Sequence, residues 1–294
     1  MDFTIQDKQG SSAVIRDMGG ELKSFRTGGH EYIWQGDGIH WGESSPFLFP
    51  IASNVRQDTV YIEGKPYHLK QHGFARKLCW EAVKESENSV TLRLTDTPET
   101  LTAYPFRFAM DACYTLAGGV LTLEVTVQNR DNRPMPYCLG THPGFGVPFD
   151  GSESRFEDYS VVFEKEEENS CPLYDGEKRE INVENRASFL EPDNRTIRLD
   201  YGVIDRAGTI IFDKMNSSSV DLVDNRTGRK LTLGFEGFDY IAFWTDGGAF
   251  LCMEPWQGLS SCSDEDDNFL SKRGVQVLEP DEEKRHILRF SVQQ

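Results

Sequence analysis

The chain has 294 residues and an excess of acidic over basic side chains, 48 against 31, which gives a net charge of −17. This charge repels nucleic-acid phosphates and anionic membrane surfaces, so we expect neither as a partner, and a neutral small molecule fits best. Hydrophobic residues make up 38% of the chain and aromatic residues 12%. That share suffices for a packed core and excludes a disordered protein.

Alternating apolar and polar residues, the pattern of half-buried β-strands, recur along the chain. The clearest runs are VTLRLTD at 90–96, LTLEVTVQN at 121–129, KLTLGF at 230–235 and VQVLEP at 275–280. Hairpin turns are predicted at Glu63-Gly64, at Gly118-Gly119 and between Asn225 and Gly228. No segment carries an apolar stripe over three helical turns. We therefore predict an all-β fold of antiparallel strands in a single domain spanning 1–294, with few short helices.

The chain shows no signs of export or membrane insertion. It does not begin with a basic segment followed by an apolar run, and no stretch approaches about 18 apolar residues. The cysteines lack any CxxC spacing, and we expect all of them to be reduced thiols; they are Cys79, Cys113, Cys138, Cys171, Cys252 and Cys262. A cytoplasmic monomer or homodimer is the expectation.

The usual cofactor signatures are missing from the sequence. None of the six histidines has HxH or HExxH spacing, and there is no glycine-rich phosphate loop and no Gly-x-Ser-x-Gly elbow. We therefore expect neither a metal nor another cofactor.

Three short stretches combine polar residues with Gly, Pro and aromatic residues. They are SSPFLFPIASNVRQD at 44–58 followed by QHGFAR at 71–76, LGTHPGFGVPF at 139–149, and FLCMEPWQGLSS at 250–261. His142 ends an apolar run and precedes a loop, a suitable place for a proton donor. Glu254 lies within an apolar run, where a carboxylate is costly unless it is paired or functional. Each residue also has an ordinary structural interpretation: His142 as a turn residue, Glu254 as a salt-bridge partner and Arg76 as a partner of surface carboxylates.

Taken in order, the motifs FPIASNVR…QHGFAR, THPGFGVPF and CMEPWQGL resemble those of the aldose 1-epimerases, or mutarotases, and most closely their LacX-like branch. The resemblance implies a large antiparallel β-sandwich of the galactose mutarotase type. It also implies an isomerase that interconverts the α and β anomers of a free aldose by ring opening and closure.

The resemblance further suggests roles for individual residues. His142 resembles the acid that protonates the ring oxygen, and Glu254 resembles the base that takes the anomeric proton. Residues similar to the family's sugar-binding positions are Arg56, His72, Arg76 and Asp205. Gly73 would let the backbone approach the sugar closely. From ordinary pKa values, the acid–base pair should be a charged histidine beside a carboxylate.

Departures from the family pattern leave the sugar open. Gly144 stands where the family often has tyrosine, which removes support for galactose specificity. Two alternatives remain beside a free-aldose mutarotase. One is a hexose-6-phosphate mutarotase, which would need a basic pocket. The other is a carbohydrate-binding or regulatory module that has lost catalysis.

Overall fold

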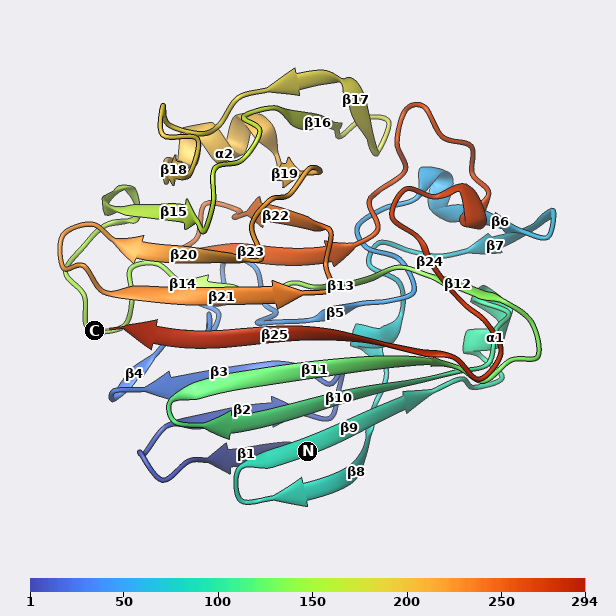
Figure 1. Cartoon of the computed structure of the whole chain (residues 1–294), viewed down its shortest axis with the longest axis horizontal. Helices are drawn as coiled ribbons and strands as arrows, with labels where there is room; N and C mark the ends of the chain where they lie inside the picture. Colours follow the sequence, from blue (N-terminus) through green and yellow to red (C-terminus); the bar gives the residue numbers. More distant parts are fainter. Residues whose placement is uncertain (294) are drawn as a thin grey trace.

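A computed structural model describes residues 1–293. Its largest sheet is antiparallel and has nine strands (Figure 1). In order across the sheet they are β18 (Thr196–Arg198), β15 (Tyr159–Phe163), β20 (Ser219–Asp224), β21 (Lys230–Glu236), β25 (Glu283–Gln293), β11 (Val120–Asn129), β10 (Phe108–Ala117), β9 (Ser89–Thr95) and β8 (Glu81–Ser86). The predicted hairpins at Gly118-Gly119 and at 225–228 join β10 to β11 and β20 to β21.

A six-stranded sheet carries the second and third sequence motifs. It consists of β19 (Ile210–Phe212), β22 (Tyr240–Trp244), β23 (Phe250–Gln257), β13 (Leu139–Thr141) and β5 (Phe47–Leu48), and β14 (Gly144–Gly146) also pairs with β23. A four-stranded sheet holds β1 (Asp2–Gln6), β2 (Ser12–Arg16), β3 (Leu22–Thr27) and β4 (His30–Glu31). Three two-stranded sheets complete the strands: β6 (Thr59–Ile62) with β7 (Lys65–His68), β12 (Met135–Tyr137) with β24 (Gln276–Leu278), and β16 (Cys171–Asp175) with β17 (Glu180–Ala187).

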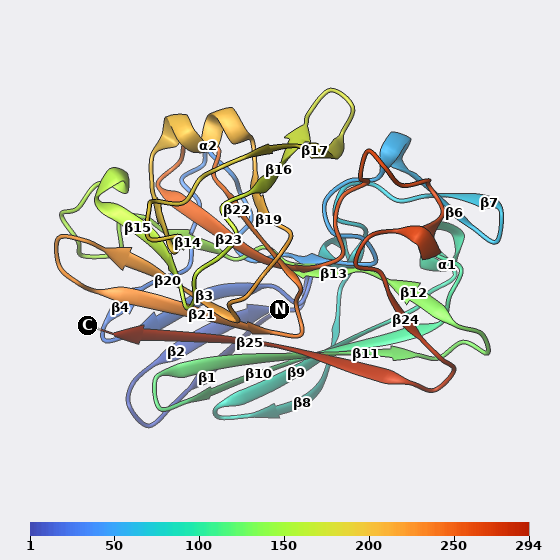
Figure 2. The ribbon, with the colours of Figure 1, turned by 45° about the horizontal axis from the view of Figure 1, so that its top comes forward.

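The core lies between the nine-stranded sheet and the sheets behind it (Figures 1 and 2). Every second residue of β11 is buried, as the alternation in its sequence predicts. Leu123 and Val125 of this strand belong to the same apolar cluster as Leu251 and Met253 of β23. The predicted β-sandwich is therefore confirmed.

Helical structure is confined to short pieces, again as predicted. The α-helices are α1 (Thr100–Ala103) and α2 (Tyr201–Ala207), and single 3-10 turns occur at η1 (Arg56–Asp58), η2 (Ala75–Lys77), η3 (Phe156–Asp158) and η4 (Phe269–Ser271). Within residues 1–293, no helix has the length and apolar character needed to cross a membrane. All six cysteines are free thiols.

Strand β23 positions the candidate site because both of its faces are buried. Leu251 and Met253 point into the main core. The period of two then places Cys252, Glu254 and Trp256 on the opposite face. Figure 1 shows β16, β17 and α2 above β22 and β23. Residues of β16, of the turn that follows it and of α2 line a cavity together with Glu254 and Trp256.

Candidate active site

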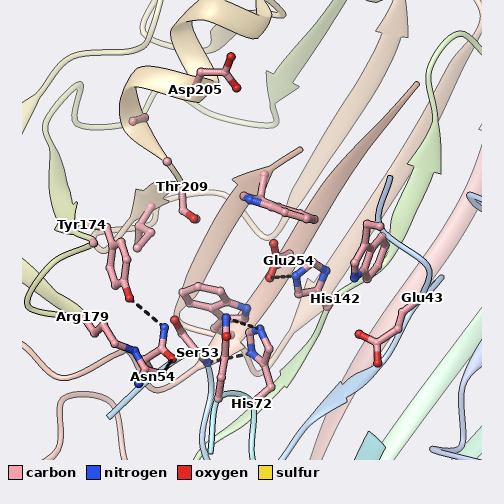
Figure 3. Close-up of a pocket in the computed structure, with 18 of the residues that line it drawn as sticks. Glu43, Ser53, Asn54, His72, His142, Tyr174, Arg179, Asp205, Thr209 and Glu254 are labelled. Carbon is pink, nitrogen blue, oxygen red and sulfur yellow. Dashed lines mark hydrogen bonds and ion pairs between the residues drawn. The ribbon is translucent and has the colours of Figure 1, made fainter. Parts of the chain in front are cut away.

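A cavity of about 790 Å³ lies over β22 and β23 (Figure 3). This volume is within the usual range for small-molecule sites, about 300–1,000 Å³. The lining comes from all three sequence motifs, from the turn between β16 and β17, and from the C-terminal end of α2. Segments distant in sequence therefore converge on one concave surface.

His142 and Glu254 meet in this cavity, where the predicted acid and base were expected to lie together. The His142 Nε2 atom is 3.2 Å from Glu254 Oε2. The two residues are only 7% and 1% exposed. Backbone hydrogen bonds fix both, because the His142 N–H donates to Pro46 and the Met253 N–H donates to the Pro143 carbonyl.

Burial sets the protonation of this pair. It lowers the pKa of His142 to about 3 and raises the pKa of Glu254 well above its ordinary value. Burial therefore disfavours the expected charged pair in the resting protein, because desolvation is the largest cause of both shifts. A neutral histidine beside a protonated glutamic acid carries the same single proton as the charged pair. Transfer of that proton between His142 Nε2 and Glu254 Oε2, which are 3.2 Å apart, interconverts the two forms.

Buried polar atoms without hydrogen-bond partners gather around the pair. Among residues 1–293, four such side-chain atoms belong to the site or adjoin it: Arg76 Nε, Thr141 Oγ1, His142 Nδ1 and Trp256 Nε1. Most buried polar atoms in folded proteins are paired. Unpaired buried polar atoms gathered in one place indicate a surface that can form hydrogen bonds with a polar ligand.

Tryptophans enclose His142. The Trp41 ring is tilted by 32° to the imidazole, with the ring centres 4.8 Å apart, and the Trp244 ring meets the imidazole edge-on at 5.6 Å. Trp41 also explains Gly144, because a Cβ atom at residue 144 would lie 2.7 Å from Trp41 Cζ3. A tyrosine at this position is therefore excluded here. Sequence analysis missed Trp41 and Trp244, since neither lies in a recognisable motif.

His72 also lines the cavity, with its ring 5.5 Å from that of His142. The Ser53 backbone N–H donates to His72 Nδ1 at 3.2 Å. Burial lowers the His72 pKa well below its ordinary value, so the neutral ring carries its proton on Nε2, which lies 3.3 Å from the Gln71 side-chain amide. Gly73 has a different role from the predicted one. A Cβ there would lie 2.1 Å from the Phe49 carbonyl oxygen, so the close approach is to the protein's own backbone.

Arg76 and Asp205 are lining residues as well, but in different settings. Arg76 Nη1 is 2.7 Å from Glu43 Oε2, within the cavity wall. Asp205 is exposed on α2, and Figure 3 shows it well away from His142 and Glu254.

Arg56 does not line the cavity, contrary to the predicted sugar contact. Its guanidinium binds Glu180 at 2.8 Å and Asp267 at 2.9 Å, and it donates to the carbonyls of Cys262 and Glu265. These contacts connect η1 to the start of β17 and to the 262–267 loop. Arg56 is therefore placed to hold the loops behind the cavity, because its donors are already engaged.

One group of side chains could hold a metal ion. Ligand atoms of His142, Cys252 and Glu254 all lie within 4.8 Å of one another. Nitrogen, sulfur and carboxylate oxygen together suit zinc. However, His142 Nδ1 lacks the hydrogen-bond partner that normally orients a metal-bound histidine. Burial also raises the pKa of the Cys252 thiol well above its usual value, which opposes formation of the thiolate ligand.

Comparisons with known proteins agree with this geometry. The chain is 33% identical over 260 residues to the plasmid-encoded protein LacX of Lactococcus lactis subsp. lactis, covering 85% of this chain and 86% of LacX. Its fold matches a galactose mutarotase related enzyme from Lactobacillus acidophilus with a TM-score of 0.92 and 27% identity, over 100% of this chain and 98% of the other. A galactose mutarotase-like protein from Lactobacillus casei ATCC 334 matches with a TM-score of 0.90 and 26% identity, over 100% of both chains. The sequence profile of the family Aldose 1-epimerase matches residues 1–291. The chain belongs to the aldose 1-epimerase family.

Proposed function

We propose that this protein is an aldose 1-epimerase that interconverts the α and β anomers of a free aldose. The observation that carries the proposal is the contact between His142 Nε2 and Glu254 Oε2, 3.2 Å apart inside a cavity. In a pyranose, the ring oxygen and the anomeric hydroxyl oxygen are bonded to the same carbon. Two neighbouring proton-transfer groups can therefore serve both oxygens of one sugar.

The chemistry needs one acid, one base and no other reactant. In the charged form of the pair, Glu254 takes the proton of the anomeric hydroxyl while the bond from C1 to the ring oxygen breaks. The ring oxygen takes its proton from His142. Rotation about the C1–C2 bond and attack of the hydroxyl on the other face of the aldehyde then give the second anomer, with both proton transfers reversed. The pair ends with the single proton it started with. His72, which lines the cavity beside His142, helps to hold the sugar.

Charges in the cavity favour a neutral sugar over a phosphorylated one. Arg76 is paired with Glu43, and Arg179 lies 3.0 Å from Asp58. The third lining arginine, Arg206, follows Asp205 directly in α2. A phosphate site would need cations in excess of nearby carboxylates.

Polarimetry tests the proposal. Fresh α-glucose, α-galactose and aldose 6-phosphates are added to the wild type and to Glu254→Gln, and the spontaneous rate is subtracted. We expect catalysis with a neutral aldose and a loss of about 10²–10⁴-fold in the variant, the usual range for one proton-transfer group. Equal activity in a folded Glu254→Gln protein would refute the mechanism. A wild type that binds sugars without accelerating mutarotation would identify a binding module, and a preference for phosphates would identify the phosphorylated substrate.

A further inference from the structure

Asn54, Tyr174 and Arg179 form a second polar cluster in the cavity, which we call the distal wall. All three line the cavity, and none takes part in the proton transfers described above. Figure 3 shows them on the opposite side of the view from His142 and Glu254. Tyr174 and Arg179 come from the hairpin of β16 and β17, and Asn54 comes from the first sequence motif.

The hydrogen bonds of the distal wall fix the direction of each donor. Arg179 has only donors, and its Nη2 donates to Asn54 Oδ1. Asn54 must therefore turn its amide nitrogen towards Tyr174, and Nδ2 donates to the Tyr174 hydroxyl at 2.9 Å. Because the Tyr174 oxygen accepts this bond, its own proton remains available to a ligand in the cavity. The distal wall thus presents the Tyr174 hydroxyl to the cavity as a hydrogen-bond donor.

The wall is also held in place from behind. The Ile181 N–H of β17 donates to the Ser261 carbonyl at 2.8 Å, and the Ser261 N–H donates to the Asn54 carbonyl at 3.1 Å. Arg56 binds Glu180 at the beginning of β17. Arg179 is further held by Asp58 at 3.0 Å. Such preorganisation suits a group that selects a ligand by hydrogen bonding.

We infer that the distal wall determines sugar specificity by donating the Tyr174 hydroxyl proton to an oxygen on C3 or C4 of the aldopyranose. This inference rests on the proposed function, which fixes C1 and the ring oxygen at His142 and Glu254. In a six-membered ring, C4 lies across from C1, and C3 lies across from the ring oxygen. The side of the sugar that faces away from the acid–base pair therefore carries these two hydroxyls. The substrate class is an aldopyranose with a free hydroxyl at the position the wall contacts.

The test combines an enzyme change with a substrate change. Wild type and Tyr174→Phe are compared on glucose, 2-deoxyglucose, 3-deoxyglucose and 4-deoxyglucose by anomer-exchange NMR. On either 3-deoxyglucose or 4-deoxyglucose, wild-type kcat/KM should fall by about 2–12-fold, the usual value of one neutral hydrogen bond. Tyr174→Phe should show a similar loss on glucose, mainly through KM, and no further loss on that same deoxy sugar. Its loss should persist in full on 2-deoxyglucose, whose missing hydroxyl lies next to C1.

A second variant tests the direction of the hydrogen bonds. Asn54→Asp keeps the shape and the contact with Arg179, but a carboxylate has only acceptors. Tyr174 would then have to donate to residue 54, and its proton would no longer be free for the sugar. We expect the same substrate pattern as in Tyr174→Phe although the tyrosine is present. Tyr61→Phe, at a residue that is 43% exposed and does not line this cavity, is the matched control and should behave as wild type.

The possible outcomes separate this inference from the proposed function. If the wild type is active but the effects of Tyr174→Phe and of each missing hydroxyl simply multiply on all three deoxy sugars, the inference is overturned and the mutarotase assignment stands. If the wild type shows no activity with any aldose, the proposed function fails. The same comparison is then made with Kd values from calorimetry, and equal losses on every sugar would overturn the inference there too. Circular dichroism melting shows whether each variant is folded.

Discussion

The two sides of the cavity differ in how their polar groups are satisfied. On the β23 side, His142 and Glu254 are almost fully buried, and His142 Nδ1 has no hydrogen-bond partner. On the distal wall, Asn54 and Arg179 are joined by a hydrogen bond, and the Arg179 side chain is 38% exposed. In the mechanism that we propose, the first side keeps the proton-transfer groups desolvated. The second side keeps the proposed recognition groups fixed.

This difference follows from what each task requires. A group that exchanges a proton with a substrate must have an open position towards it, and burial strengthens its electrostatic interactions. A group that recognises a ligand hydroxyl by hydrogen bonding gains most from a fixed orientation, because less conformational entropy is lost on binding. The comparison predicts that changes on the β23 side reduce kcat, whereas changes at or behind the wall mainly raise KM.

The largest effect should come from the acid–base pair. His142→Asn and Glu254→Gln should each reduce kcat by about 10²–10⁴-fold. The double variant should be little worse than the poorer single variant, because one transfer without the other gives little acceleration. Polarimetric kcat values for the four proteins measure this. Two losses that multiply in the double variant would show that His142 and Glu254 do not act as a unit.

A smaller effect is expected from Arg56, which supports the wall from outside the cavity. Arg56→Ala removes charged hydrogen bonds to Glu180 and Asp267, each worth about 1.5–3 kcal/mol. If the wall loses stabilisation equal to the free energy of one such hydrogen bond, KM should rise about 10-fold, with kcat nearly unchanged. Saturation kinetics give both parameters, and thermal melting gives the loss of stability.

Arg93→Ala is the matched control for Arg56. Arg93 forms a bidentate ion pair with Asp111 on the nine-stranded sheet, and neither residue lines the cavity. This variant should leave KM unchanged and cost at most about 1 kcal/mol of stability. A similar rise in KM in both variants would mean that the Arg56 effect is general loosening of the fold.

The pH dependence of kcat sharpens the contrast between buried and exposed groups. Burial lowers the pKa of His142 to about 3. In the resting protein the imidazole is therefore neutral above that pH and becomes cationic only below it. We expect kcat to change less than about twofold through pH ~6.5, where an ordinary histidine titrates. Polarimetry in buffers of constant ionic strength measures the profile. A limb with its midpoint near ~6.5 would contradict this expectation and show that the pair gains or loses a proton there, at His142 or at Glu254.

The smallest effect should come from metal removal. Neither proton transfer needs a Lewis acid, so dialysis against a chelator should leave kcat unchanged. Metal analysis of the dialysed protein accompanies the assay. Activity that disappears with the chelator and returns with one added metal ion would assign the His142, Cys252 and Glu254 cluster to a working metal site.

The sequence alone determined the strand-rich fold and the centre of the site. Alternation with a period of two, as in 121–129, reports which face of a strand is buried, and it predicted β11 within one residue at its start. His142 and Glu254 could be selected because a titratable residue inside an apolar run is costly, and the ordered motifs strengthened that choice. These signals are local, so one chain is enough to read them.

Tertiary structure decided what depends on contacts between distant segments. The pattern of the β16–β17 hairpin gives no sign that Tyr174 and Arg179 meet Asn54, because a hydrogen bond across 120 or more positions leaves no period in the sequence. Arg56 lies within a family-like motif, yet its neighbours in space direct its guanidinium away from the cavity. The lowered pKa of His142 could not be read from the sequence for the same reason. Desolvation is set by all the atoms packed around a side chain, and only the folded chain brings those atoms together.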